Sequence, residues 1–128
     1  MQIHLLKGKL HRALVTDANV KYEGSLTIDH DLMDKVRLLP FERVVCGNLA
    51  NGNRFETYAI PGKRDSGDIV LNGATAHLGQ AGDRLTIMFF GLLGDRFPLI
   101  TKIMNKLSMI TTVFIKHLFP HIAIPTNG

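Results

Sequence analysis

The sequence predicts a small, mainly β protein, and two observations support this prediction. Over about residues 1–90, short segments with alternating apolar and polar residues, or with many β-branched residues, are separated by turn residues roughly every 8–12 positions. The chain has 128 residues, a length that suits one domain with a single core. Because closing a sheet removes its exposed edges, we expect a small β-barrel with one or two short helices.

The expected elements follow from the turn residues between them. The expected strands are residues 1–6, 15–20, 25–28, 43–48, 55–60, 69–71 and 84–90. A helix is expected over residues 29–39, because Asp29 and Asp31 can cap its start and Pro40 ends it. These elements define one β domain over residues 1–95.

The chain after residue 95 has a different composition. Residues 1–95 hold eleven basic and eleven acidic residues, whereas residues 96–128 hold four basic residues and no acidic one. Apolar residues at helical spacing predict a C-terminal helix over residues 98–119, and its uncharged run is too short for a membrane span. We expect this tail to dock on the β domain or on a neighbouring subunit. The less favoured alternative is a basic helix on a membrane surface.

Composition and motifs argue against several classes of function. The N-terminus lacks the apolar run and the cleavage site of a secretory signal, so a cytoplasmic protein is expected. The β domain has no net charge, and the chain has no Trp and two Tyr, which argues against nucleic-acid binding. The histidines show no metal-ligand spacing, so no metal site is expected. The single cysteine, Cys46, lies in an apolar run and is expected to be buried rather than nucleophilic.

Polar residues where strands meet turns are the remaining candidates for a functional site. The chain contains neither a glycine-rich phosphate-binding loop nor a hydrolase nucleophile elbow. The polar candidates are Lys9, His11, Tyr22, Ser25, Arg54, Thr57, Tyr58 and Asn72. Each has an ordinary structural explanation when it is taken alone, so the information lies in their order and spacing.

In their order along the chain, these segments resemble the aspartate 1-decarboxylase family. The matching stretches are GKLHRALVTDANVKYEGSLTID, NGNRFETYAIPGKRDSG and LNGATAH, followed by Gly82-Asp83. They cover about residues 1–90, and the combination of YEGS with RFETY is specific, whereas either one alone is not. The resemblance implies a six-stranded double-psi β-barrel that assembles as a homotetramer, with active sites between neighbouring subunits.

The resemblance also implies a role for the junction between Gly24 and Ser25. Members of this family cut their own chain here, which would give fragments of residues 1–24 and 25–128. Ser25 Oγ would attack the Gly24 carbonyl, Thr57 would stabilise the oxyanion, and residue 25 would end as a covalently bound pyruvoyl group. Neither a metal nor pyridoxal phosphate is implied. Cleavage is either spontaneous or assisted by a helper protein.

The implied reaction is decarboxylation of L-aspartate to β-alanine and carbon dioxide, for pantothenate biosynthesis. Tyr58 matches the proton donor of the family, and Lys9 and Arg54 would bind the carboxylates of the substrate. The remaining residues of the implied site are Thr57, Asn72, Gly73, Ala74 and Thr75 around the substrate, with His11 and Tyr22 lining the pocket.

Two other functions stay open from the sequence. A β-barrel that no longer matures would be an interaction module that binds a partner through its tail. A decarboxylase of the same type would act on another acidic amino acid such as glutamate, since one methylene in a fixed pocket is worth only about 1–3 kcal/mol. After about residue 90 the chain departs from the family pattern, and Thr75 stands where the family usually has alanine.

Overall fold

The computed structural model describes residues 1–94. In chain order its elements are β1 (Gln2–Leu14), β2 (Asp17–Asn19), β3 (Leu26–Asp29), α1 (His30–Val36), β4 (Arg43–Asn48), β5 (Arg54–Gly62), β6 (Ile69–Asn72), the 3-10 helix η1 (Gly73–His77) and β7 (Arg84–Gly94). Across these residues, no helix has the length and apolar character that spanning a membrane requires. The predicted C-terminal helix and the tail, residues 96–128, lie outside the described residues.

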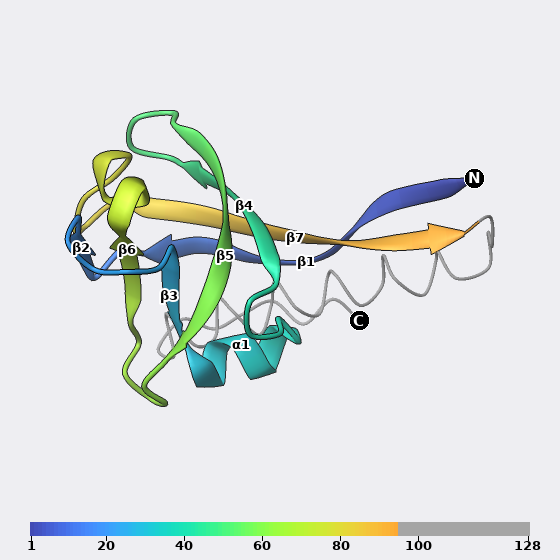
Figure 1. The fold of residues 1–128 in the computed structure, drawn as a ribbon, viewed down its shortest axis with the longest axis horizontal. Helices are drawn as coiled ribbons and strands as arrows, with labels where there is room; N and C mark the ends of the chain where they lie inside the picture. Colours follow the sequence, from blue (N-terminus) through green and yellow to red (C-terminus); the bar gives the residue numbers. More distant parts are fainter. Residues whose placement is uncertain (95–128) are drawn as a thin grey trace, which may run out of the picture.

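The strands form one mixed sheet in the order β1, β7, β4, β5, β3, β6, β2 (Figure 1). The pairs β3–β5 and β2–β6 are parallel, and the other neighbours are antiparallel. Figure 1 shows β1 and β7 as a long ribbon with the other strands gathered toward one end. The prediction of a mainly β, barrel-like fold is confirmed. In residues 1–94 the sheet has seven strands rather than the expected six, because the short β2 pairs with β6 at its edge. The strand pairing of these residues does not close the sheet into a ring.

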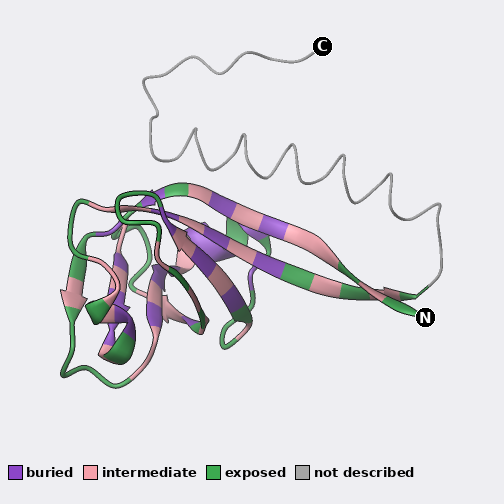
Figure 2. Ribbon diagram, turned by 90° about the horizontal axis from the view of Figure 1, so that it is seen from above, coloured by how far each residue is buried: buried purple, intermediate pink, exposed green. Residues whose placement is uncertain are grey.

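The core joins the inner face of the sheet to α1. Leu10 of β1, Ile87 of β7 and Cys46 of β4 are cross-strand neighbours, and all three are fully buried. Burial raises the pKa of the Cys46 thiol to about 12, so this thiol stays protonated at neutral pH. The prediction of a buried Cys46 is confirmed. In Figure 2, the end of the β1–β7 ribbon near the N-terminus is exposed or half-buried instead.

The strand β1 is longer than the predicted strand over residues 1–6 and continues through Gly8 to Leu14. Gly8 is buried within β1 and pairs with Phe89 of β7. A Cβ atom at Gly8 would lie 2.5 Å from Cζ of Phe89, so the buried aromatic ring occupies the space of the missing side chain. A register shift between Leu6 and Gly8 accompanies this close approach.

The helix α1 is shorter than the predicted range of residues 29–39. It ends at Val36 because Arg37 adopts a left-handed conformation with φ 58°, and the Arg37 N–H bonds back to the last turn of the helix. At the other end, Asp29 caps the helix as predicted, since its carboxylate accepts a hydrogen bond from the N–H of Asp31 at 2.8 Å.

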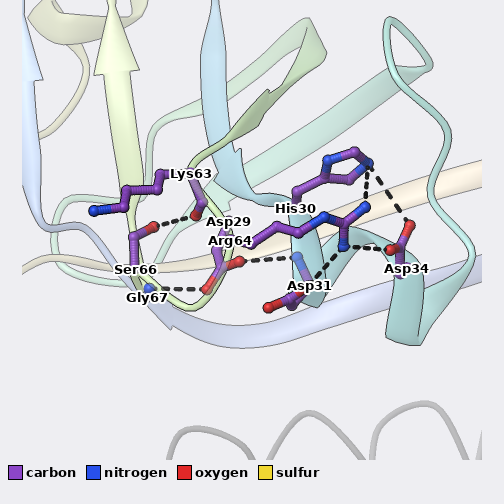
Figure 3. Close-up of polar contacts among 8 residues, drawn as sticks. All are labelled: Asp29, His30, Asp31, Asp34, Lys63, Arg64, Ser66 and Gly67. Atoms are coloured by element: carbon purple, nitrogen blue, oxygen red, sulfur yellow. Dashed lines mark hydrogen bonds and ion pairs between the residues drawn. The ribbon is translucent and has the colours of Figure 1, made fainter.

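The side chain of Asp29 also joins α1 to the loop between β5 and β6. It is fully buried, and its second oxygen accepts a hydrogen bond from the Gly67 N–H at 2.8 Å. Next to it, Arg64 donates to Asp31 at 2.6 Å and to Asp34 at 2.7 Å (Figure 3). The hydrogen bond from Arg64 lowers the pKa of the Asp31 carboxyl. These contacts fix the C-terminal end of β3 at Asp29. The N-terminal end of β3, Leu26, directly follows the Gly24–Ser25 junction, where cleavage is predicted.

Candidate functional site

The Gly24–Ser25 junction lies in the turn between β2 and β3, immediately before Leu26. Gly24 has a φ of 116°, a conformation that residues with a side chain rarely adopt. A Cβ atom at Gly24 would also overlap Cδ1 of Ile60 in β5. The backbone conformation therefore favours glycine at this position, and any larger residue would also displace the end of the Ile60 side chain.

The carbonyl oxygen of Ser25 accepts two hydrogen bonds. Asn72, the last residue of β6, donates its backbone N–H at 3.0 Å, and Thr75 in η1 donates its hydroxyl at 2.8 Å. The same Thr75 oxygen lies 2.8 Å from the carbonyl oxygen of Asn72, and Thr75 is only 7% exposed. Because a hydroxyl has one proton, it can be donated to one of these two carbonyls at a time.

Asn72 and Gly73 hold this part of the chain together. Nδ2 of Asn72 donates to Oγ1 of Thr27 at 2.8 Å, which ties the end of β6 to β3. Gly73 has a φ of 58°, and a Cβ atom on it would lie 3.4 Å from the carbonyl oxygen of Gly24. The predicted site residues that lie together here are Gly24, Ser25, Asn72, Gly73, Ala74 and Thr75.

The strand β5 runs beside the junction and carries Thr57 and Tyr58 on opposite faces. Since β3 and β5 are parallel with Leu26 opposite Ala59, the junction before Leu26 lies at the level of Thr57 and Tyr58. Thr57 is half-buried on the face of Ala59, whereas Tyr58 is 41% exposed on the other face. The ring of Tyr58 lies 6.5 Å from that of Phe41, centre to centre. Thr57 and Tyr58 therefore lie on opposite faces of β5, at the level of the junction.

Lys9 and Arg54 lie at a distance from the junction within one chain. Cross-strand pairing leads from Lys9 to Met88, then to Val45 and then to Glu56, so three strand spacings separate Lys9 from β5. At about 4.8 Å per spacing, the path along the sheet is roughly 14 Å long. Arg54 begins β5, four residues before Tyr58. In the described part of the chain, neither Lys9 nor Arg54 forms an ion pair with an acid.

The two predicted pocket-lining residues have different environments. Tyr22 is 55% exposed, and its carbonyl oxygen is 3.5 Å from the position of a Cβ on Gly73. His11 is half-buried, and its buried Nδ1 has no hydrogen-bond partner among residues 1–94. Burial lowers the pKa of His11 from its ordinary value of 6.5, and the positive charges of Lys9 and Arg12 lower it further. His11 is therefore mainly neutral at pH 7.

Acidification is expected to destabilise the native protein through His11. Because the pKa of this imidazole is lower in the folded chain, the unfolded chain binds the proton first as the pH falls. The free energy of unfolding should decrease from about pH 6.5 down to the pKa of the folded state, and His11→Phe should lack this part of the decrease. Urea denaturation at a series of pH values measures it. The same pH dependence in the variant and the wild type would contradict this assignment.

Two residues that sequence analysis did not single out help to form the site. Thr27 accepts the hydrogen bond from the Asn72 side chain, and Ile60 packs over Gly24. Thr27 and Ile60 are opposite one another in the parallel pair β3–β5. Both lie within the stretches that match the family, but they look like ordinary strand residues there, because neither carries a charge or a recognised chemical role. Only the register of the strands reveals their positions.

The fold and this site define a small, mainly β protein built around a Gly–Ser junction in a special backbone conformation. A family model described as "Aspartate decarboxylase" matches residues 1–106. The chain is 52% identical over 96 residues to an aspartate 1-decarboxylase of Leptospira biflexa, covering 75% of this chain and 81% of the relative. It is 54% identical over 92 residues to that of Bacillus subtilis, covering 72% of each. The chain therefore belongs to the aspartate decarboxylase family, and the resemblance stated from its motifs is confirmed.

Proposed function

We propose that this protein decarboxylates L-aspartate to β-alanine and carbon dioxide for pantothenate biosynthesis, after cutting its own chain between Gly24 and Ser25. Membership of the family supports the decarboxylase activity. The observation that carries the proposal is the junction itself, where Gly24 has a positive φ and the Ser25 carbonyl is held by two donors. The cytoplasm stays the expected location from the sequence.

Self-cleavage begins with the hydroxyl of Ser25. Its Oγ attacks the carbonyl carbon of Gly24, and the C–N bond between the two residues is replaced by an ester bond. Glycine gives the backbone the freedom to reach the tetrahedral arrangement, and Thr57, at the same level of β5, would stabilise the oxyanion. Elimination would release Gly24 as a carboxylate and leave dehydroalanine at residue 25. Addition of water and loss of ammonia would then leave a pyruvoyl group at the start of fragment 25–128. A helper protein, if one acts, would accelerate these same steps.

The residues around Ser25 fit a pyruvoyl group. The group would consist of atoms of residue 25 itself, and the carbonyl oxygen that it retains already has donors from Asn72 and Thr75. Glycine at position 73 leaves open the space next to the Gly24 carbonyl. Once formed, the group supplies a ketone that binds the substrate amine and takes up the electron pair left when carbon dioxide departs.

Arg54, Lys9 and Tyr58 are assigned to the substrate. The guanidinium of Arg54 can bind a carboxylate through two parallel hydrogen bonds, and Lys9 adds a second positive charge. The phenol of Tyr58 returns a proton to the carbon that has lost carbon dioxide. The groups that would complete the pocket are Thr57, Asn72, Gly73, Ala74 and Thr75, with His11 and Tyr22 at its wall.

We further propose that the active sites form between neighbouring subunits of a homotetramer. Within one chain, β7 and β4 lie between the strand of Lys9 and β5, which supports a second copy as the source of the Lys9 side chain in each site. The sheet also has a surface groove, lined by His4, Arg43, Val45, Phe90 and Leu92. Phe90 is 41% exposed and Leu92 57% exposed, and a second copy over this groove would bury both side chains.

Turnover of L-aspartate and L-glutamate, measured side by side, tests the substrate. Aspartate should be preferred roughly 10- to 200-fold in kcat/KM, because one additional methylene changes transition-state binding by about 1–3 kcal/mol. Release of carbon dioxide from each acid by the purified protein gives the two values. A preference for glutamate would contradict the assignment of substrate, and release from neither acid would contradict the decarboxylase activity.

A further inference from the structure

We propose that the hydroxyl of Thr75 is catalytic in the self-cleavage reaction, where it and the Asn72 N–H stabilise negative charge on the carbonyl oxygen of Ser25. The inference rests on the proposed self-cleavage and assigns a step of it to a side chain. Its basis is the pair of hydrogen bonds to this oxygen, of 2.8 Å from Thr75 and 3.0 Å from Asn72. Two convergent donors on one carbonyl oxygen form the arrangement that stabilises oxyanions in other enzymes.

The charge arises in the elimination step that follows ester formation. Water removes the proton on Cα of Ser25, and the electrons of the Cα–H bond form a double bond between Cα and Cβ. The Cβ–Oγ bond breaks, and Gly24 leaves as a carboxylate. While the proton is being transferred, the electrons at Cα are shared with the adjacent Ser25 carbonyl, whose oxygen therefore gains negative charge. Donors on this oxygen lower the energy of that transition state.

The position of the Thr75 hydroxyl makes its contribution larger in the transition state than in the ground state. Its oxygen lies 2.8 Å from both the Ser25 and the Asn72 carbonyl oxygens. In the uncut chain these are two neutral acceptors, and the single hydroxyl proton is shared between them. When the Ser25 oxygen becomes negative, a hydrogen bond to it becomes roughly twice as strong as one to a neutral carbonyl. Only such a difference accelerates a reaction.

Both donors are fixed before the reaction begins. The Asn72 side chain is bound to Thr27, which holds the Asn72 backbone N–H at the end of β6. Thr75 is 7% exposed, so little water competes for its hydroxyl. A buried, fixed donor requires little reorganisation when charge develops, and its effect is stronger there than in water. The Thr75 hydroxyl of η1 and the Asn72 N–H are thus in place to stabilise the transition state of elimination at Ser25, just before β3.

Replacement of Thr75 by valine tests this role, because valine keeps the shape of the side chain and removes the hydroxyl. The full-length chain is incubated after purification, and intact mass spectrometry follows the uncut chain and the carbonyl-terminated fragment 25–128. Hydroxylamine is added to portions, since it cleaves the ester and gives a fragment 25–128 that begins with serine. In Thr75→Val we expect elimination to be about 10- to 100-fold slower, with more of the chain trapped as ester. Thr75→Ser, which keeps the hydroxyl, should eliminate at nearly the wild-type rate.

Thermal unfolding of each variant shows whether it has folded, and Thr75→Ala provides a second hydroxyl-free chain if valine does not fit. If a folded variant without the hydroxyl eliminates at the wild-type rate and accumulates no additional ester, the role of Thr75 is refuted, whereas the proposed self-cleavage still stands. A wild-type chain that never cuts would overturn the proposed self-cleavage together with it. A variant that is slow merely because it is less stable would not accumulate the ester, since formation and elimination would slow together.

Discussion

Replacement of Ser25 by alanine should leave the chain uncut and abolish turnover of aspartate. Alanine has no oxygen with which to attack the Gly24 carbonyl, so neither the ester nor the pyruvoyl group can form. The position of the junction before β3 does not depend on the hydroxyl, because the backbone of residue 25 makes its hydrogen bonds through the carbonyl oxygen. The variant should therefore fold with a stability near that of the wild type. Gel electrophoresis and release of carbon dioxide measure the two losses.

Ser66→Ala is the matched control for this experiment. Ser66 lies in the loop between β5 and β6, and its hydroxyl donates to the Lys63 carbonyl of the same loop at 2.6 Å (Figure 3). No role in cleavage or turnover is assigned to it. Its loss should leave cleavage and turnover unchanged. Cleavage in Ser25→Ala at the wild-type rate would refute the nucleophile. The alternative of an interaction module predicts a different result: the wild-type chain itself stays uncut, and Ser25→Ala leaves binding through the tail unchanged.

Replacement of Tyr58 by phenylalanine should separate cleavage from turnover. The phenol is assigned to proton return, and loss of such a proton donor slows catalysis by roughly 10²- to 10⁴-fold. Cleavage should proceed, because Thr57, the residue assigned to the cleavage oxyanion, lies on the opposite face of β5. The expected result is a fully cut chain with a much smaller kcat and a nearly unchanged KM. Intact mass spectrometry measures the extent of cleavage, and steady-state kinetics measures kcat and KM.

A change at Phe41 controls for the packing of the Tyr58 ring. Phe41→Leu removes the neighbouring ring, whose centre lies 6.5 Å from that of Tyr58, and keeps the phenol. Its kcat should stay much closer to the wild-type value than that of Tyr58→Phe. Equal losses in the two variants would indicate that the ring contact matters rather than the hydroxyl group.

Much of the fold could be predicted because it depends on local patterns. The alternation of apolar residues revealed most of the strands, and the position of Asp29 before an apolar helical face revealed the cap of α1. The errors lie where tertiary packing overrides a local pattern. The first strand was expected to end at residue 6, yet β1 continues through Gly8, where the ring of Phe89 fills the space of the missing side chain. The end of α1 at Arg37 depends on a left-handed residue that no local pattern indicates.

The candidate site was predicted through its motifs, and its geometry was not. The order of the segments pointed to Ser25 and Thr75, but neither spacing nor composition shows that the Thr75 hydroxyl bonds to the Ser25 carbonyl. That contact depends on the pairing of β3 with β6, which brings together residues fifty positions apart in the chain. The distance of Lys9 from β5 likewise follows from the order of the strands, which a period-two pattern does not reveal.

Intact mass spectrometry of the purified wild-type chain tests the central claim most directly. The claim is that the Gly24–Ser25 junction produces the group on which decarboxylation depends. The predicted result is two fragments, residues 1–24 and 25–128, with the larger one carrying a terminal carbonyl group that reacts with a hydrazide, in a sample that releases carbon dioxide from aspartate. A single uncut chain that releases carbon dioxide equally well would contradict the account.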